Sequence, residues 1–150
     1  MRSGTAGVAG CRGFDPALRV VGRKRHALVD TGGRLLLAAV SPASVHDSHG
    51  GTALLCASRR PRLFLTLCYA DRAYAGPWVA TPIAVTRVGN PPGQRGFAMQ
   101  PRRWAVERSF AWVGRWRRLA RDHEATPSSA LAFFVLAHAT ILVRRLACPL

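Results

Sequence analysis

Acidic side chains are scarce in this 150-residue chain, which has 7 aspartates and glutamates against 22 lysines and arginines and a formal net charge of +15. A charge of this sign and size says little about the fold, but it favours a polyanionic partner such as a nucleic acid. Lysine is nearly absent as well: Lys24 is the only lysine in the chain. A GC-rich genome can produce this arginine excess without selection for binding, so the charge alone does not establish the partner.

The sequence also lacks the cysteine spacing of a zinc finger and the apolar segments of a signal peptide or a membrane span. The four cysteines, at positions 11, 56, 68 and 148, form no C-x-x-C pair, and we expect reduced, mostly buried thiols in a cytoplasmic protein. The first residues lack the apolar segment of a signal peptide. The longest apolar run, residues 131–143, is shorter than the roughly 20 residues of a membrane span. It predicts a buried helix and no membrane contact.

The order of elements predicts a mixed α/β domain. Residues 1–13 are rich in glycine and poor in apolar side chains, which indicates a disordered lead-in before a single domain over residues 14–150. Residues 23–30 and 34–40 flank Thr31-Gly32-Gly33, a pattern that predicts a β-hairpin with glycines at positive φ. Ser48 is then placed to cap a helix over residues 50–59.

The second half of the chain changes from strand to helix. Residues 62–70 are almost entirely apolar, which predicts a strand buried on both faces and ending at Asp71. Among the prolines that follow, only residues 83–88 favour a strand. A helix is expected over residues 103–121, and Thr126-Pro127 predicts the start of a second one.

Glu107 is the only acid in the stretch PRRWAVERSFAWVGRWRR (residues 101–118), which contains six arginines. On a helical wheel, Val106 and Phe110 belong to a broad apolar surface, whereas Glu107 falls on a separate stripe with Ala111 and Gly114. An exposed glutamate near arginines is usually a solvated ion pair worth well under about 1 kcal/mol. Small neighbours, in contrast, would let a bulky ligand approach the carboxylate, so both interpretations stay open.

Asp71 adds a second carboxylate at the end of a strand, where open α/β sheets place their ligand sites. Two carboxylates in so basic a chain suggest a divalent ion held between protein and phosphate, and Mg²⁺ or Mn²⁺ suits such oxygen ligands. Asp71 is equally compatible with a turn or a helix cap. His46 and His49 have a spacing that could suit a metal, but we interpret them as ordinary loop residues.

Three segments resemble a known family: GRKRHALVDTGGRLLLAAVSPASVHD (22–47), YADRAYAG (69–76) and PRRWAVERSFAWVGRWRRLARDHEATPSSA (101–130). They are similar to the C-terminal part of bacterial insertion-sequence transposases of the DDE type. The resemblance implies an RNase H-like fold and metal-dependent cleavage and transfer of DNA strands. It further implies Mg²⁺ or Mn²⁺ as cofactor and double-stranded DNA, at transposon ends and target sites, as partner.

The resemblance assigns Asp71 to the family's second aspartate and Glu107 to its glutamate, both as catalytic metal ligands. Arg103 resembles the signature arginine, whereas the family's tyrosine and lysine positions hold Gln100 and Gly114. In the family the first aspartate lies upstream of the Gly-Phe-Asp element found here at residues 13–15. Asp15 and Asp30 match a loop and a hairpin turn of the family, and we assign neither to the metal.

We therefore expect an incomplete RNase H-like domain: a β-hairpin, a helix, a central strand and two C-terminal helices. Its function would be that of a truncated transposase remnant with DNA binding but impaired catalysis. One alternative is a full enzyme supplied with its first aspartate by an upstream or frameshifted segment. Others are a non-catalytic DNA-binding module that self-associates or pairs with intact transposase, and a product that never folds stably. The candidate DNA contacts are Lys24, Arg25, Arg102, Arg103, Arg108, Arg115, Arg117 and Arg118.

Overall fold

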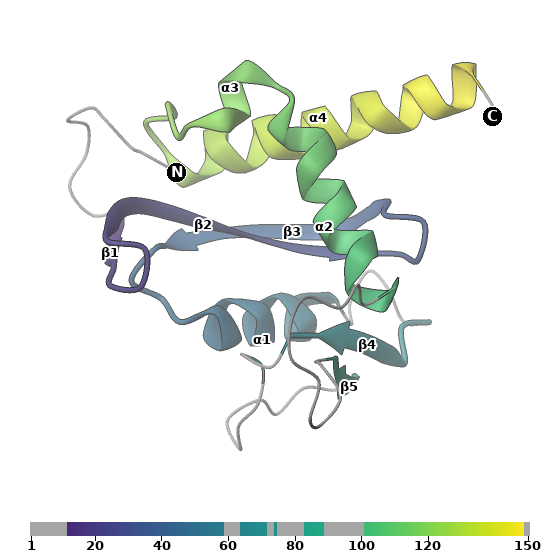
Figure 1. Ribbon diagram of the computed structural model, residues 1–150, viewed down its shortest axis with the longest axis horizontal. Helices are drawn as coiled ribbons and strands as arrows, with labels where there is room; N and C mark the ends of the chain where they lie inside the picture. Colours follow the sequence, from purple (N-terminus) through teal and green to yellow (C-terminus); the bar gives the residue numbers. More distant parts are fainter. Residues whose placement is uncertain (1–11, 59–63, 72–73, 75–82, 89–100, 149–150) are drawn as a thin grey trace, which may run out of the picture.

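The computed structural model describes residues 12–58, 64–71, 74, 83–88 and 101–148. Figure 1 shows the layers of the molecule: the terminal helices lie above a three-stranded sheet, helix α1 lies below that sheet, and a two-stranded sheet lies below α1. Helix α2 (Pro101–Gly114) runs down one side and contacts strands of both sheets. The expected mixed α/β class is confirmed.

The three-stranded sheet is antiparallel, with the order β1-β2-β3. Its strands are β1 (Gly13–Asp15), β2 (Val20–Val29) and β3 (Leu35–Pro42). Strands β2 and β3 form the predicted hairpin, but of the two turn glycines only Gly33 has a positive φ, of 76°, which favours glycine. Of the expected lead-in, residues 1–11 lie outside the described residues, whereas Arg12 and Gly13 belong to the fold because β1 begins at Gly13.

Helix α1 (Asp47–Ser58) begins three residues earlier than the sequence indicated. Ser48 is therefore not the residue before the helix but lies in its first turn, where its side chain is completely buried. His46 takes over the capping contact, because its Nδ1 lies 3.3 Å from the Ser48 backbone N–H and 2.7 Å from the Ser48 hydroxyl. The helix covers one face of β2 and β3.

The lower sheet consists of β4 (Leu67–Ala70) and β5 (Ala84–Arg87), which pair in parallel. Within the described residues, neither strand is hydrogen-bonded to the upper sheet. The strand expected over residues 62–70 covers only Leu67–Ala70 among the described residues, and it is not buried on both faces: Cys68 packs on the core formed with α1, but Leu67 is exposed. Residues 62 and 63 lie outside the described residues. The strand at residues 83–88 is confirmed as β5.

The helix expected over residues 103–121 is interrupted. Helix α2 ends at Gly114, and the short helix α3 (Arg117–Ala120) follows after a turn. Glycine has a low helix propensity, which is consistent with the end of α2 at Gly114.

Helix α4 (Pro127–Ala147) begins as predicted: the Thr126 hydroxyl accepts a hydrogen bond from the Ser129 N–H at 3.1 Å, with proline at the first helical position. Only its inner face is buried, where Phe134 and Ala137 join a core with Val113 and Leu119. By length and composition alone α4 is long and apolar enough to cross a membrane, and 22% of its most apolar window is buried inside the molecule. The expectation of a buried helix was therefore correct for one face only.

The cysteines differ from the prediction as well. Cys56 and Cys148 are exposed, whereas Cys68 is half-buried and burial raises its thiol pKa. Cys11 lies outside the described residues. The apolar residues next to a cysteine in the sequence therefore do not predict whether its side chain is buried.

Candidate metal and nucleic-acid site

Asp71 lies directly after β4, as predicted, and its side chain is exposed. Its backbone carbonyl accepts a hydrogen bond from the Tyr74 N–H at 3.0 Å. The Tyr74 ring lies so close to Gly51 of α1 that a Cβ at Gly51 would overlap it. Burial raises the pKa of Tyr74, and the nearby carboxylates and Cys68 add to this, so the phenol stays neutral. Packing of Tyr74 on α1 therefore positions the turn that carries Asp71.

Glu107 lies on the exposed side of α2 together with Ala111 and Gly114. A Cβ placed on Gly114 would meet no atom within 4 Å, so the space beside this stripe is open. Both observations agree with the wheel. The buried side of α2 differs in one respect, because Ser109 lies at its centre with 1% exposure, while Phe110 is 36% exposed.

A buried hydrogen bond sets the rotation of α2. The Ser109 hydroxyl lies 2.8 Å from Nε2 of His138, and Nδ1 of His138 lies 3.0 Å from the Phe134 carbonyl. Because a carbonyl only accepts, Nδ1 carries the proton and Nε2 accepts from the serine. Burial lowers the pKa of His138, which keeps the ring neutral. With Ser109 fixed inward on α4, Glu107 is held outward.

The elements that carry the two carboxylates touch each other. Helix α2 packs against β4, and Figure 1 shows the lower end of α2 beside that strand. Two carboxylates are suitable oxygen ligands for Mg²⁺ or Mn²⁺. In the described part of the chain, however, no three His, Cys, Asp or Glu side chains gather into a metal-binding group. Asp71 and Glu107 therefore supply suitable oxygen atoms, but among the described residues they do not form a complete metal site.

The two other aspartates considered from the sequence have local partners. Asp15 is buried, accepts backbone hydrogen bonds from Ala17 and Leu18, and pairs with Lys24 at 3.3 Å. The hydrogen bond from Leu18, the one from Ala17 and the Lys24 ammonium together lower its pKa although burial opposes them. Asp30 accepts from the Arg34 N–H at 2.8 Å within the hairpin turn. Both carboxylates therefore contribute to the fold, although Asp15 lies at the end of β1 and not in the expected loop.

Three of the candidate DNA contacts are directed into the fold. Lys24 lies within 3.3 Å of both Asp15 and Asp47 and donates to the Val45 carbonyl. Arg25 donates to the Leu119 carbonyl, and Arg108 donates to the Gly32 carbonyl and stacks on Trp112. Arg25 also lies over the Phe134 ring, and its burial lowers its pKa.

The exposed candidates gather at the turn between α2 and α3. We call Arg115, Arg117 and Arg118 the basic cluster; all three are exposed. Arg118 donates to Glu124 at 2.7 Å and lies over the Phe133 ring, yet its side chain remains 59% exposed. The helix break at Gly114 therefore presents three guanidinium groups within four residues. The side chains of Arg102 and Arg103 lie outside the described residues.

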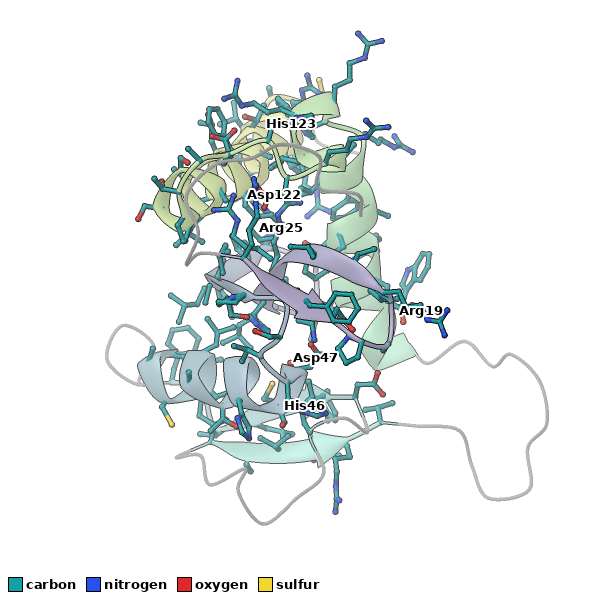
Figure 2. The ribbon with its side chains drawn as sticks, turned by 90° about the vertical axis from the view of Figure 1, so that its left-hand side faces the viewer. Arg19, Arg25, His46, Asp47, Asp122 and His123 are labelled. Atoms are coloured by element: carbon teal, nitrogen blue, oxygen red, sulfur yellow. The ribbon has the colours of Figure 1, made fainter. Side chains whose placement is uncertain are left out.

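An ion-pair network that the sequence did not reveal ties β2 to the segment before α4. Arg23, only 2% exposed, donates through Nε and Nη2 to both carboxylate oxygens of Asp122 at 2.7 Å. It also donates to the Glu124 carbonyl, and Arg12 adds a contact to Asp122 at 3.6 Å. Figure 2 shows Asp122 beside Arg25, between the three-stranded sheet and the terminal helices. The sequence signal for this network was the pair of acidic residues in Arg-Asp-His-Glu (121–124), but nothing in the sequence indicated that β2 supplies the basic partner.

The interpretation of His46 and His49 as loop residues was correct only for His46, because α1 begins at Asp47 and includes His49. Their rings lie 6.3 Å apart in an edge-on arrangement, and His46 is engaged by Ser48. Figure 2 shows His46 and Asp47 where α1 begins, below the sheet.

The family assignment follows from comparison with known proteins. A family model described as the transposase DDE domain matches residues 5–142. The chain belongs to this family of DDE transposase domains. No curated protein and no solved structure matches it. The family generally uses a divalent metal and acts on DNA.

Proposed function

We propose that this chain is the DNA-binding and metal-binding domain of a bacterial insertion-sequence transposase. The observation that carries the proposal is the position of Asp71 and Glu107: both are exposed, Asp71 directly follows β4, Glu107 lies on α2, and β4 and α2 contact each other. These are the carboxylates that the family resemblance assigns to the metal. The family match over residues 5–142 supports the same function.

An RNase H-like arrangement is part of the proposal. It is supported by the antiparallel β2–β3 hairpin, the following α1, the parallel pair β4–β5 and the terminal helices. In that arrangement a further strand would lie between the hairpin and β4. The separation of the two sheets among the described residues is compatible with such a position.

Asp71 and Glu107 are proposed to hold Mg²⁺ or Mn²⁺ against a DNA phosphate. When bound, the ion supplies an activated water and stabilises charge on the phosphate. Asp71 is positioned through the turn closed by Tyr74, and Glu107 through the Ser109–His138 hydrogen bond on the opposite side of α2. Because the resemblance assigns only two of the family's three carboxylates, we expect DNA binding with impaired cleavage.

A cleavage assay tests this part of the proposal. The purified chain is incubated with a transposon-end duplex and Mg²⁺ or Mn²⁺, next to the Glu107→Ala variant. We expect little cleavage by either protein. Efficient cleavage that the substitution abolishes would overturn the claim of impaired catalysis.

The basic cluster is proposed to contact the phosphate backbone. Replacing Arg115 and Arg117 with alanine should weaken binding to duplex DNA. The slope of the logarithm of the binding constant against the logarithm of the salt concentration should become shallower by the equivalent of about two phosphate contacts. A matched control is the double variant of Arg34 and Arg87, two exposed arginines outside the cluster that remove the same charge. Equal losses from both double variants would show that net charge, and not this surface, determines binding.

The second candidate function is a non-catalytic DNA-binding module in the cytoplasm, acting by self-association or by pairing with intact transposase. The exposed basic cluster favours it because binding through these arginines requires no carboxylate. Under this function Glu107→Ala leaves both DNA affinity and its metal dependence unchanged. If DNA affinity rises with Mg²⁺ in the wild type but not in Glu107→Ala, the metal-site proposal is favoured instead.

A further inference from the structure

The outward face of α4 carries an apolar stripe that the described part of the fold leaves exposed. Its residues follow spacings of four, three, four and three: Ala132, Leu136, Ala139, Val143 and Leu146, here called the outer seam. Leu136 is 59% exposed, Val143 63% and Leu146 82%. This spacing is the heptad pattern of helices that pair along their length. It is distinct from the inner face, where Phe134 and Ala137 are buried.

We propose that the outer seam pairs with the same seam of a second copy of this chain, with the two α4 helices antiparallel and the two-fold axis at Ala139. The proposal deepens the self-association named with the proposed function and assigns it a surface. It does not depend on DNA or metal. Figure 1 shows α4 on the outside of the molecule, so a second helix can approach it without displacing the sheet.

The seam is complementary to itself in side-chain size. About a two-fold axis at Ala139, Ala132 of each copy faces Leu146 of the other, and Leu136 faces Val143. Ala132 thus receives the larger Leu146 at each end of the seam, Leu136 and Val143 pack against each other, and Ala139 meets Ala139 at the closest approach. Alternation of large and small residues across facing positions is what allows helices to interdigitate.

Charge favours the antiparallel direction. Arg144 and Arg145 form the only basic pair within α4 and occupy its last turn. In a parallel pair these arginines would lie at the same level in both copies. Antiparallel pairing about Ala139 separates the two Arg144 residues by about 15 Å along the axis. That exceeds the screening length of roughly 8–10 Å at moderate salt, and it also aligns the helix dipoles favourably.

The area is sufficient for a specific but modest dimer. Covering the exposed parts of the seam and of the adjacent Val135 on both copies buries on the order of 1,000 Å², the lower limit for a specific interface. Insertion of α4 into a membrane would instead require the inner face to leave β3 and α2. The inner face contains the buried Ser109–His138 contact, so a second copy on the outer face is the occupant that preserves the fold.

Sedimentation equilibrium of the full chain tests the interface. We expect a monomer–dimer equilibrium at about 10–100 μM and a dissociation constant at least about tenfold higher for Leu136→Glu, because pairing would bury a carboxylate. Leu18→Glu places the same charge at another exposed leucine, 67% accessible in the β1–β2 turn, and should leave the equilibrium unchanged. Circular dichroism melts confirm that both variants fold. A monomeric wild type, or an unaltered dimer in Leu136→Glu, would overturn the proposal.

Cysteine cross-linking tests the direction and the axis. In a background with the four native cysteines replaced by serine, Ala139→Cys should form a disulfide-linked dimer, whereas Leu146→Cys should not, because its two copies lie about 21 Å apart. Cross-linking of both variants would indicate parallel helices and contradict the model of pairing. Flotation with phosphatidylcholine–phosphatidylglycerol vesicles examines the other occupant. If the wild type stays monomeric and floats with the vesicles, and Leu136→Glu abolishes flotation, the outer seam binds lipid and the dimer proposal is wrong.

Discussion

The two ends of the candidate metal site belong to regions that are held together differently. Glu107 lies in the upper region, where Arg23 binds Asp122 before α4, Arg25 binds the Leu119 carbonyl of α3, and Ser109 of α2 binds His138 of α4. Asp71 lies in the lower region, where four-residue strands rest on α1 mainly through apolar side chains. The orientation of Glu107 is therefore determined by specific buried hydrogen bonds, whereas that of Asp71 depends on a turn held by the packing of Tyr74 on α1.

The largest expected difference between the regions comes from removing a phenylalanine ring. Phe134 is 1% exposed and contacts Phe110, His138 and the Arg25 guanidinium. Phe134→Ala should lower the free energy of unfolding by about 3–5 kcal/mol because it leaves a cavity in the upper core. Urea denaturation measures the change.

The matched variant in the lower region is Phe64→Ala. Phe64 is 71% exposed, so its loss should change the free energy of unfolding by less than about 0.5 kcal/mol. Similar losses from the two variants would contradict the contrast between the regions.

The second prediction concerns the ion pair of the upper region. Asp122→Asn should destabilise the fold by about 3 kcal/mol, because it leaves the Arg23 guanidinium buried without its counter-charge. The corresponding change at the exposed hairpin turn, Asp30→Asn, weakens a pair with Arg34 that is solvated and should cost less than about 1 kcal/mol. Thermal melts of the two variants compare them directly, and an equal shift would show that the Arg23–Asp122 pair adds nothing to the fold.

A smaller effect is expected from pH. Burial lowers the pKa of His138 from 6.5, so the unfolded chain binds a proton more readily than the folded one. Stability should therefore be complete above the unfolded pKa and fall as the pH decreases from about 7.5 to 5.5. Because burial lowers the pKa of His26 too, both histidines contribute to this fall.

Chemical denaturation across this pH range measures the slope. His138→Gln should reduce the pH dependence, whereas His123→Gln, at an exposed histidine, should not. A slope that is unchanged in His138→Gln would contradict the assignment of a neutral buried imidazole between α2 and α4.

Local signals predicted the hairpin and the last helix. Thr31-Gly32-Gly33 requires a turn residue at positive φ, and Thr126-Pro127 caps a helix by a contact within four residues. The prediction of burial from the sequence was wrong where tertiary contacts determine it. In the apolar segment before Asp71, Phe64 and Leu67 are exposed because packing on α1 covers only part of the segment. Periodicity also missed the interruption after Gly114.

For the candidate site, the resemblance and the wheel predicted that Glu107 faces outward and that Asp71 follows a strand, and the structure places both there. The basic residues were harder to assign, because an arginine that binds DNA and one that donates to a distant carbonyl look alike in a sequence. Lys24, Arg25 and Arg108 are engaged with partners on other segments, up to 94 positions away for Arg25. Only the fold separates them from the exposed basic cluster.

The most direct test of the account is Mn²⁺ binding, followed by electron paramagnetic resonance in the presence of duplex DNA. A shared site predicts that Asp71→Asn and Glu107→Gln each abolish most of the bound Mn²⁺, while Asp30→Asn, a carboxylate engaged in the hairpin turn, leaves it unchanged. Binding that survives either substitution, or that falls equally in Asp30→Asn, would contradict a metal held jointly by β4 and α2.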